Sequence, residues 1–172
     1  MRLPISYWPI EGMRIAYENA VKLHHIGVVT RHFRECINLY EELEYSKSIS
    51  VHDPLQMASI ALMERPGEPL IEIIAPEGEH SPAYQWLKRI KAGAYHICYE
   101  TPSLAKATAL LREQDFMVIS DPVPAVAFDN RQVVFLWSAL TGLVELVESV
   151  RSFSENRHSG SVEDPLLAKV EL

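Results

Sequence analysis

The sequence lacks the features of a disulfide-stabilised or membrane-spanning protein. Its 172 residues include only two cysteines, Cys36 and Cys98, with no CxxC spacing, so we expect both to be reduced core residues. Charged or polar residues interrupt the longest apolar stretches well before the roughly 20 positions that a membrane-spanning helix needs. Residues 1–11 also lack the apolar core of a signal peptide. We therefore expect no membrane association and a cytoplasmic location.

An excess of positive charge is also missing. The formal net charge is −7, and no basic stripe is present that could neutralise phosphates, so nucleic acid is not an expected partner. A small anionic ligand is not excluded, because one local lysine or a metal ion can override the global sign. Hydrophobic residues make up 48% of the chain, which is ample for one compact domain or for two fused half-domains that share a core.

What the sequence does contain is an internal duplication. Two segments each contribute one histidine, in KLHHIGVV and AYHICYE, and one glutamate, in PLIEIIAP and GLVELVE. These four residues are His25, Glu72, His96 and Glu145. Histidine and glutamate are 47 positions apart in the first segment and 49 in the second. Residues 39–45 align in apolar register with residues 110–116 at a similar offset of about 71, so the helical parts repeat together with the polar ones.

Hydrophobic periodicity predicts the same order of elements in both segments. The first segment is expected to form a strand at 21–29, a helix at 31–44 and strands at 46–51, 56–63 and 70–74. A short helix at 81–90 follows. The second segment is expected to form a strand at 95–100, a helix at 103–114 and strands at 116–119, 125–128, 132–137 and 143–147, one of them short or irregular.

This order predicts an α+β fold of two tandem β-α-β-β-β modules that form a curved mixed-sheet cup. One such module leaves a face of its sheet uncovered, and pairing two closes the core and creates a shared cup for a ligand. We expect a single domain at 21–150, with module one at 21–76, a linker helix at 77–91 and module two at 92–150. Residues 1–20 would be an N-terminal extension that packs as an arm or helix. Residues 151–172 would be a C-terminal tail, either mobile or exchanged with a neighbouring chain.

The repeated histidines and glutamates suit a divalent metal ion. Imidazole nitrogen and carboxylate oxygen bind zinc, nickel, cobalt, manganese or iron, and the lack of cysteine ligands argues against a closed structural zinc site. Strand alternation places His25 on one face with Leu23 and Gly27. An unpaired carboxylate buried among apolar neighbours costs about several kcal/mol, so Glu72 and Glu145 each need a cation or a proton. A metal ion answers both needs.

Other conspicuous side chains are expected to have structural roles, because a lone histidine or aromatic residue in a strand is more often packed than functional. No metal is assigned to the remaining histidines, which are His24, His32, His52, His80 and His158. We expect Cys98 and Tyr99 to be core residues. We also expect four aromatic side chains to pack in the protein rather than to stack on a substrate, namely Tyr40, Trp86, Phe135 and Trp137.

Four segments in this order and spacing resemble the vicinal oxygen chelate superfamily, namely HHIGVV, LIEIIAP, YHICYE and FLWSALTGLVELVE. That superfamily includes glyoxalase I, methylmalonyl-CoA epimerase, extradiol dioxygenases and fosfomycin- and bleomycin-resistance proteins. The resemblance covers residues 22–150. Within it, HHIG and APEGEHSPAYQWLKR look most like the epimerases. The resemblance implies a glyoxalase-like fold, a homodimer and a metal held by His25, Glu72, His96 and Glu145.

The chain departs from the epimerase pattern in two places. Glu72 stands where the epimerases usually have glutamine, as in the glyoxalase I pattern. Leu55 stands where they have a glutamate thought to act as a base, and a leucine cannot move a proton. Either Glu145 acts alone, or a neighbour among His52, Asp53 and Gln56 substitutes, or the substrate differs. Glyoxalase I also fits imperfectly, because the chain has no basic cluster for glutathione carboxylates and no glycine at Glu44, where a helix-ending glycine is common.

The function that follows is a metal-dependent isomerase or epimerase, acting through a metal-stabilised enolate on a small acyl thioester such as an acyl-CoA. Glu145 is the first candidate for the base and Glu72 for the second, symmetry-related carboxylate. Asn130 and Arg131 are candidates for binding an anionic group of the substrate. The alternatives are a glyoxalase I-like lyase acting on a thiol adduct and a non-catalytic, resistance-type protein that binds a drug or pathway intermediate.

Overall fold

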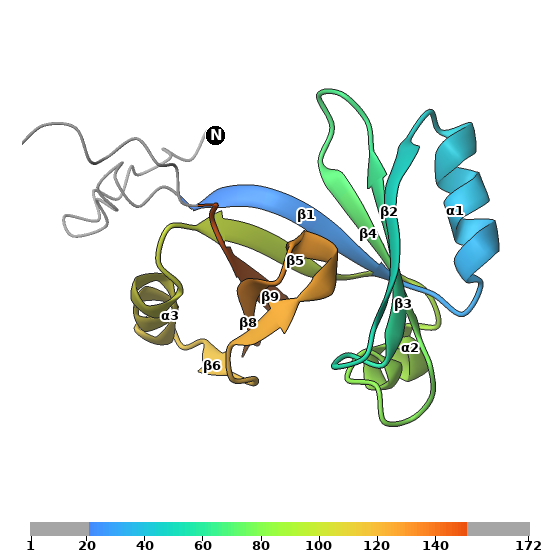
Figure 1. Ribbon diagram of the computed structural model, residues 1–172. Coiled ribbons are helices and arrows are strands. Elements are labelled where there is room, and N and C mark those ends of the chain that lie inside the picture. The colour runs from blue at the N-terminus through green and yellow to red at the C-terminus, as the bar shows by residue number, and fades with distance from the viewer. Residues whose placement is uncertain (1–20, 151–172) are drawn as a thin grey trace, which may run out of the picture.

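The computed structural model describes residues 21–150, in which nine strands form one mixed, curved sheet with three α-helices (Figure 1). The expected α+β class with a curved, mixed sheet is confirmed. The expectations for residues 1–20 and 151–172 lie outside the described residues and stay predictions. Within residues 21–150, none of the helices has the length and apolar character needed to cross a membrane.

The first half of the sheet follows the expected β-α-β-β-β order. Its elements are β1 (Lys22–Val29), α1 (Phe33–Glu42), β2 (Ser46–Asp53), β3 (Ala58–Glu64) and β4 (Leu70–Pro76). The buried side chain of Ile37 anchors α1 against Val28, Met63 and Ile73 on one face of the sheet. Cys36 packs beside them but is only half-buried, so the expectation of a core position for this cysteine is wrong.

The second half begins after α2 (Tyr84–Ile90) and is less regular. Its elements are β5 (Gly93–Thr101), α3 (Leu104–Arg112), β6 (Met117–Val118), β7 (Val123–Ala125), β8 (Arg131–Ser138) and β9 (Gly142–Glu148). The strand expected at 125–128 is wrong, because a 3-10 turn spans Val126–Phe128. Asp129 and Asn130 follow it with left-handed backbone, φ 54° and 59°, and reverse the chain. The turn buries the ring of Phe128 instead of continuing the sheet.

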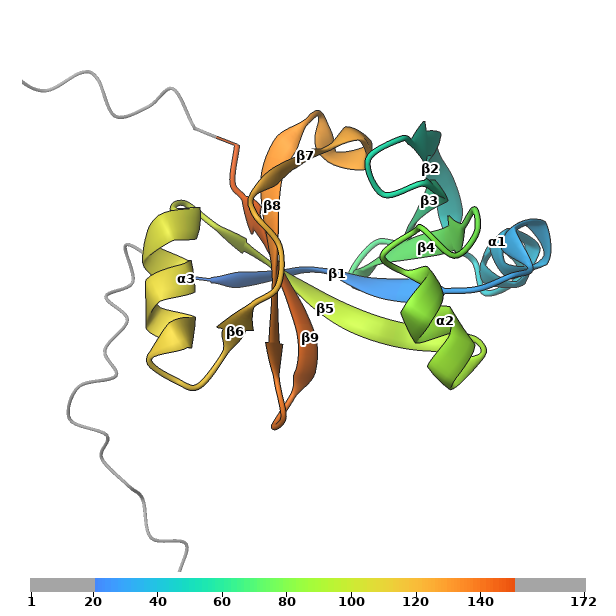
Figure 2. The same ribbon diagram turned by 90° about the horizontal axis from the view of Figure 1, so that it is seen from below.

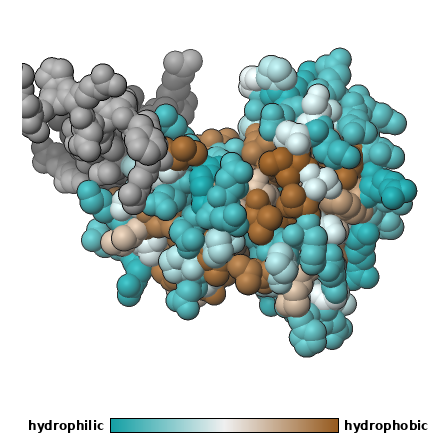
Figure 3. All heavy atoms as spheres, in the orientation of Figure 1, coloured by the Kyte–Doolittle hydropathy of each residue, from teal (hydrophilic) through white to brown (hydrophobic). Residues whose placement is uncertain are grey.

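The two halves meet along the antiparallel pair β1 and β5 at the centre of the sheet. β4 flanks this pair in parallel with β1, and β9 flanks it in parallel with β5, so the repeated strands are placed symmetrically. Helices α1 and α3 lie at opposite ends of the molecule (Figure 2). The buried core between the halves includes Ile60, Ile74, Val133 and Val147 together with Cys98, as expected for this cysteine. Hydrophobic side chains also reach the surface in the hollow where the halves meet (Figure 3).

A register shift in β1 changes which side chains share a face. Leu23 pairs with Tyr99, but His25 pairs with Cys98, so one extra residue, His24, is accommodated between them. Antiparallel partners point to the same face, so Leu23 lies on the face of Tyr99, which packs against α3. The expectation that His25 shares its face with Leu23 is therefore wrong, whereas Gly27, opposite His96, does lie on the face of His25.

Candidate metal centre

Four buried side chains converge from the four central strands, one from each. They are His25 on β1, Glu72 on β4, His96 on β5 and Glu145 on β9, and none is more than 4% exposed. The register explains why they meet: Gly27 of β1 lies between Glu72 and His96, and Cys98 of β5 lies between His25 and Glu145. The duplication thus brings two histidines and two glutamates to one point of the sheet.

The donor atoms lie close together. His25 Nε2 is 2.9 Å from His96 Nε2, 3.2 Å from Glu72 Oε2 and 3.0 Å from Glu145 Oε2. His96 Nε2 is 3.5 Å from Glu72 Oε2 and 3.1 Å from Glu145 Oε2. Neighbouring donors on one ion, with bonds of about 2.1 Å, stand roughly 3.0 to 3.4 Å apart. The spacing is therefore that of ligands around a single cation.

The cluster contains a buried oxygen that lacks a hydrogen-bond donor, and a bound cation would satisfy this oxygen. Glu145 Oε2 is fully buried and close to both imidazoles, yet it makes no hydrogen bond of good geometry. The two facing Nε2 atoms of His25 and His96 can share only one proton between them. A buried carboxylate oxygen without a hydrogen-bond donor is costly. The donor set and its unmet bonding both fit a divalent ion.

The charges around the cluster favour a cation as well. Burial opposes a charge on His25, but the charge of Glu72 and the adjacent side chains of Cys98 and Glu145 raise the pKa of His25 well above its ordinary value. Burial likewise opposes the charged form of Glu145, yet the adjacent imidazoles of His25 and His96 hold the pKa of this carboxyl well below its usual range. The site thus stabilises positive charge beside an ionised carboxylate.

A chain of hydrogen bonds supports the His25 ring from behind. His25 Nδ1 lies 2.8 Å from His24 Nδ1, His24 Nε2 lies 2.8 Å from Arg131 Nη2, and Arg131 Nη1 donates to Glu100 Oε1 at 2.9 Å. A guanidinium can only donate, so His24 Nε2 accepts. Burial, together with the nearby positive charges of His25 and Arg131, lowers the pKa of His24 to about 4, so this imidazole is neutral. His24 therefore contacts the back of His25 rather than the four-residue cluster.

Cys98 lies beside the same pair of histidines, and its Sγ belongs to a second close group with His24 and His25. Burial, together with the charge of Glu145, raises the pKa of Cys98 far above its ordinary value. A protonated thiol is a poor metal ligand. Cys98 therefore fills space against His25, as the sequence predicted.

Aromatic rings enclose the two histidines. Phe128 stacks on His25 with the ring centroids 4.9 Å apart, and Tyr95 meets His96 edge-on at 4.6 Å. Phe135 approaches His96 from another side at 5.8 Å. These rings keep water from the imidazoles, which strengthens the electrostatic interactions inside the site.

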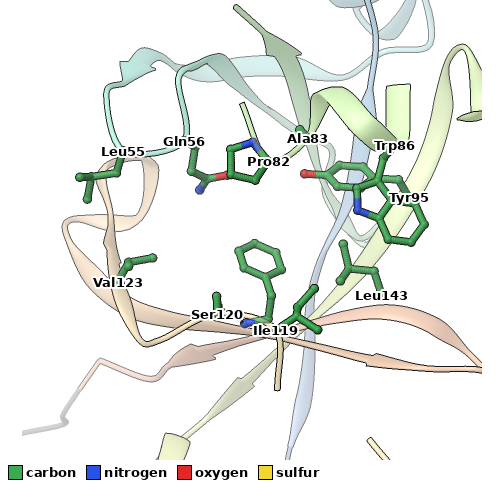
Figure 4. Close-up of a pocket in the computed structure, with 11 residues that line it drawn as sticks. Leu55, Gln56, Pro82, Ala83, Trp86, Tyr95, Ile119, Ser120, Val123 and Leu143 are labelled. Atoms are coloured by element: carbon green, nitrogen blue, oxygen red, sulfur yellow. Dashed lines mark hydrogen bonds between the residues drawn. The ribbon is translucent and has the colours of Figure 1, made fainter. Parts of the chain in front are cut away.

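A cavity of about 250 Å³ adjoins the cluster (Figure 4). Leu143 lies opposite His96 in the register of β9 and β5, and Phe135 lies opposite Glu145 in that of β8 and β9, so two wall residues neighbour two cluster residues. Trp86 of α2 forms another part of the wall. Trp86 and Phe135 were expected only to pack, and periodicity alone could not show that they border a cavity.

The loop between β2 and β3 supplies the rim of this cavity. Leu55, whose side chain is exposed, and Gln56 both line it. Asp53 is fully buried, and its Oδ1 accepts the backbone N–H groups of Leu55, at 2.8 Å, and Gln56, at 3.0 Å. His52 lies beside Glu77 at 3.3 Å. Of the three residues considered as replacements for the missing base, only Gln56 reaches the cavity, and a neutral amide cannot act as a base.

The structure does not bring Asn130 and Arg131 to the cavity wall. Arg131 is held by Glu100 and His24. Asn130 is exposed, and its backbone N–H donates to the carbonyl oxygen of Ala125. Their proposed role in binding substrate stays a prediction, and Arg131 has a second candidate role in holding His24.

Known proteins are similar to this chain in sequence and in fold. The mitochondrial methylmalonyl-CoA epimerase of Dictyostelium discoideum is 28% identical over 130 residues, covering 74% of this chain and 78% of that protein. The ethylmalonyl-CoA/methylmalonyl-CoA epimerase of Cereibacter sphaeroides is 34% identical over 67 residues, which is 38% of this chain and 50% of that protein. The crystal structure of methylmalonyl-CoA epimerase from Mycobacterium tuberculosis superposes with a TM-score of 0.67 at 23% identity, covering 76% of this chain and 89% of that one. The family model of the glyoxalase/bleomycin resistance protein/dioxygenase superfamily matches residues 24–135, and the chain belongs to this superfamily.

Proposed function

We propose that this protein is a divalent-metal-dependent isomerase that removes and returns the α-proton of a small acyl thioester, as an epimerase of a malonyl-type acyl-CoA would. The observation that carries the proposal is the buried convergence of His25, Glu72, His96 and Glu145 beside an apolar cavity. A binding protein that only sequesters an apolar ligand would not need two buried carboxylates beside its cavity.

These four residues would hold the ion, which could be zinc, nickel, cobalt, manganese or iron. When bound, it supplies Lewis-acid polarisation of the substrate carbonyl oxygens. Glu145 takes the α-proton: the C–H bond breaks, the proton passes to the carboxylate, and the electron pair stays on the carbonyl system of the substrate. Glu72 enters from β4, across the β1–β5 pair from β9; it would start the turnover protonated and give that proton to the opposite side of the α-carbon, so that the turnover ends with Glu72 ionised and Glu145 protonated. Two carboxylates on opposite sides suit inversion at the α-carbon.

Acyl-CoA is the favoured substrate class. The two curated relatives are epimerases of methylmalonyl-CoA. Helix α2 also provides counter-charge for a phosphorylated carrier, because Lys88 and Arg89 are exposed in its last turn and the guanidinium of Arg89 lies 5.9 Å over the ring of Trp86, a wall residue. A carrier that leaves the cavity past Trp86 would meet this basic turn.

A glyoxalase I-like reaction on a thiol adduct is the second candidate, since Glu72 matches that pattern rather than the epimerase glutamine. Both reactions use the same four-residue cluster.

We further propose that the protein is a homodimer and cytoplasmic, as the sequence predicts. Light scattering and cell fractionation test these two points.

The decisive experiment measures metal content and proton exchange together. Protein loaded with each candidate metal is incubated in heavy water with methylmalonyl-CoA, and deuterium at the α-carbon is followed by mass spectrometry. We expect about one ion per chain and rapid exchange. Glu145→Gln should slow exchange about 10²- to 10⁴-fold. His25→Ala should lose the metal.

Glu113→Gln is the matched control, because Glu113 is an exposed carboxylate at the end of α3. It should leave both metal content and exchange unchanged. Exchange with a hemithioacetal but not with methylmalonyl-CoA would favour the glyoxalase reaction. A folded, metal-free protein that catalyses neither exchange would contradict the proposal and favour a binding protein.

A further inference from the structure

The cavity beside the cluster is larger than a methyl group requires. Its volume is about 250 Å³. A water-sized or methylene-sized group takes about 30 Å³ in a condensed phase, so the cavity, which is partly open to solvent, has room for several such groups. The methyl branch of a methylmalonyl group would leave most of this space to water.

No charged side chain lines the cavity within the described part of the chain. Its polar side chains are those of Gln56, Ser120 and Tyr95, and the Ser120 hydroxyl already accepts the backbone N–H of Phe135 at 2.9 Å. The remaining wall is apolar, with Trp86, Ile119, Val123 and Leu143 turned toward the space (Figure 4). A carboxylate or phosphate placed there would lose its hydration without a counter-charge, whereas an alkyl chain loses nothing.

The position of the cavity identifies which part of a substrate it receives. An α-carbon within reach of Glu145 also lies near Phe135, because these residues are opposed in the register of β8 and β9. The groups bonded to the α-carbon are therefore the part of the substrate that lies nearest to the cavity. The phosphorylated end of a carrier is far from the α-carbon and needs basic partners, which stand outside on α2.

We propose that this cavity binds the α-substituent of the substrate, and that the preferred substrates are malonyl-type thioesters with an apolar α-chain of about four to six carbons rather than a methyl group. The inference rests on the proposed isomerase function and deepens it. Burial of each added methylene favours binding about fourfold until the space is full. The protein is thus an epimerase-like enzyme for larger branched acyl groups.

The test is a series of α-alkylmalonyl-CoA thioesters, from methyl to octyl, assayed by deuterium exchange with the metal-loaded protein. We expect kcat/KM to rise severalfold per carbon, to peak between four and six carbons and then to fall. Ile119→Trp fills the cavity and should move the peak to methyl. Ile97→Trp is the matched control, since Ile97 is comparably exposed but does not line the cavity, and it should keep the wild-type order.

A second readout separates this inference from the proposed function. The affinities of the free α-alkylmalonates for the metal-loaded protein are measured by calorimetry, which needs no turnover. Rising affinity with chain length, lost in Ile119→Trp, supports the cavity assignment even if no thioester exchanges, in which case only the proposed reaction fails. Equal affinities and equal exchange across the series, or an Ile119→Trp variant that slows every member alike, would overturn the inference.

Discussion

Gly27 lies directly against the imidazole of His96, and a Cβ on this residue would overlap the ring. The two residues face each other across β1 and β5. Glu72 is the partner of Gly27 on the other side, in β4. The glycine of the HHIG segment is therefore needed for space rather than for backbone freedom, because any side chain there would push His96 away from the other three donors.

Gly27→Ala should weaken metal binding while the sheet still forms. The added methyl group must displace the His96 ring, and a misplaced ligand typically costs about 10- to 100-fold in metal affinity. Cobalt or zinc titration measures the affinity, and circular dichroism reports the fold. Ala94→Val, which adds bulk at an exposed position of β5, should bind metal normally. Full affinity in Gly27→Ala would show that the ring is not held in this position.

A second prediction concerns the hydrogen bonds that run from Arg131 through His24 to His25. Arg131→Met keeps the aliphatic part of the side chain but removes the donor to His24 Nε2. Without this donor His24 Nδ1 can accept from His25 Nδ1–H, which leaves His25 Nε2 free for a metal, so that metal affinity should rise about 10-fold or more while KM at saturating metal stays unchanged. Loss of a substrate-binding arginine would give the reverse, a raised KM with normal metal affinity.

The control for this variant is Arg65→Met. Arg65 also pairs with a glutamate, Glu44, at 3.0 Å, but on the surface of the first half. It should alter neither metal affinity nor KM. The comparison therefore decides whether Arg131 positions the metal ligand or binds the substrate, the role that the sequence suggested.

The sequence predicted the convergence of four polar residues because a duplication imposes it. When two similar units pair along their first strands, equivalent positions on the first and last strands are brought to one place. His25 and His96 thus meet across β1 and β5, and Glu72 and Glu145 lie on the flanking strands. This part of the site depends on the spacing of residues along the chain, which can be read directly from the sequence.

Other features depend on contacts that a sequence does not display. The register shift that turns both His24 and His25 toward one face is a local packing solution, and strict alternation predicted the wrong side for Leu23. The turn at Val126–Phe128 follows from burial of one aromatic ring. The cavity is assembled from segments far apart in the chain, so only their folding shows it.

Leu55 offers a gain-of-function prediction. It lies at the rim of the cavity where the epimerases resembling this chain have a glutamate, and its exposed side chain leaves room for a replacement. Leu55→Glu should add a base and raise α-proton exchange on malonyl-type thioesters about 10-fold or more. Leu55→Gln introduces a side chain of the same size as glutamate that cannot act as a base, so it should not raise the exchange rate. Equal rates in the two variants would mean that this rim position lies out of reach of the α-carbon.

Charge reversal on α2 tests recognition of the carrier. The double variant Lys88→Glu/Arg89→Glu replaces two exposed positive charges beside Trp86 and should raise KM for an acyl-CoA roughly 10-fold at low salt. The effect should shrink at 0.5 M salt, because the Debye length is then only about a few ångströms and the charges on α2 are largely screened from the phosphates. The same acyl group on N-acetylcysteamine, which has no phosphate, should react equally well with wild type and variant.

Arg112→Glu is the control for net charge and reverses one positive charge where the double variant reverses two; Arg112 is the basic residue in the last turn of α3, at the opposite end of the molecule. A general effect of net charge would raise KM in this variant too, whereas a local phosphate site on α2 would leave it unchanged. If the double variant and Arg112→Glu behave alike, the basic turn of α2 does not select the carrier. The preference for acyl-CoA would then have to come from the acyl group alone, held between the four-residue cluster and the apolar cavity.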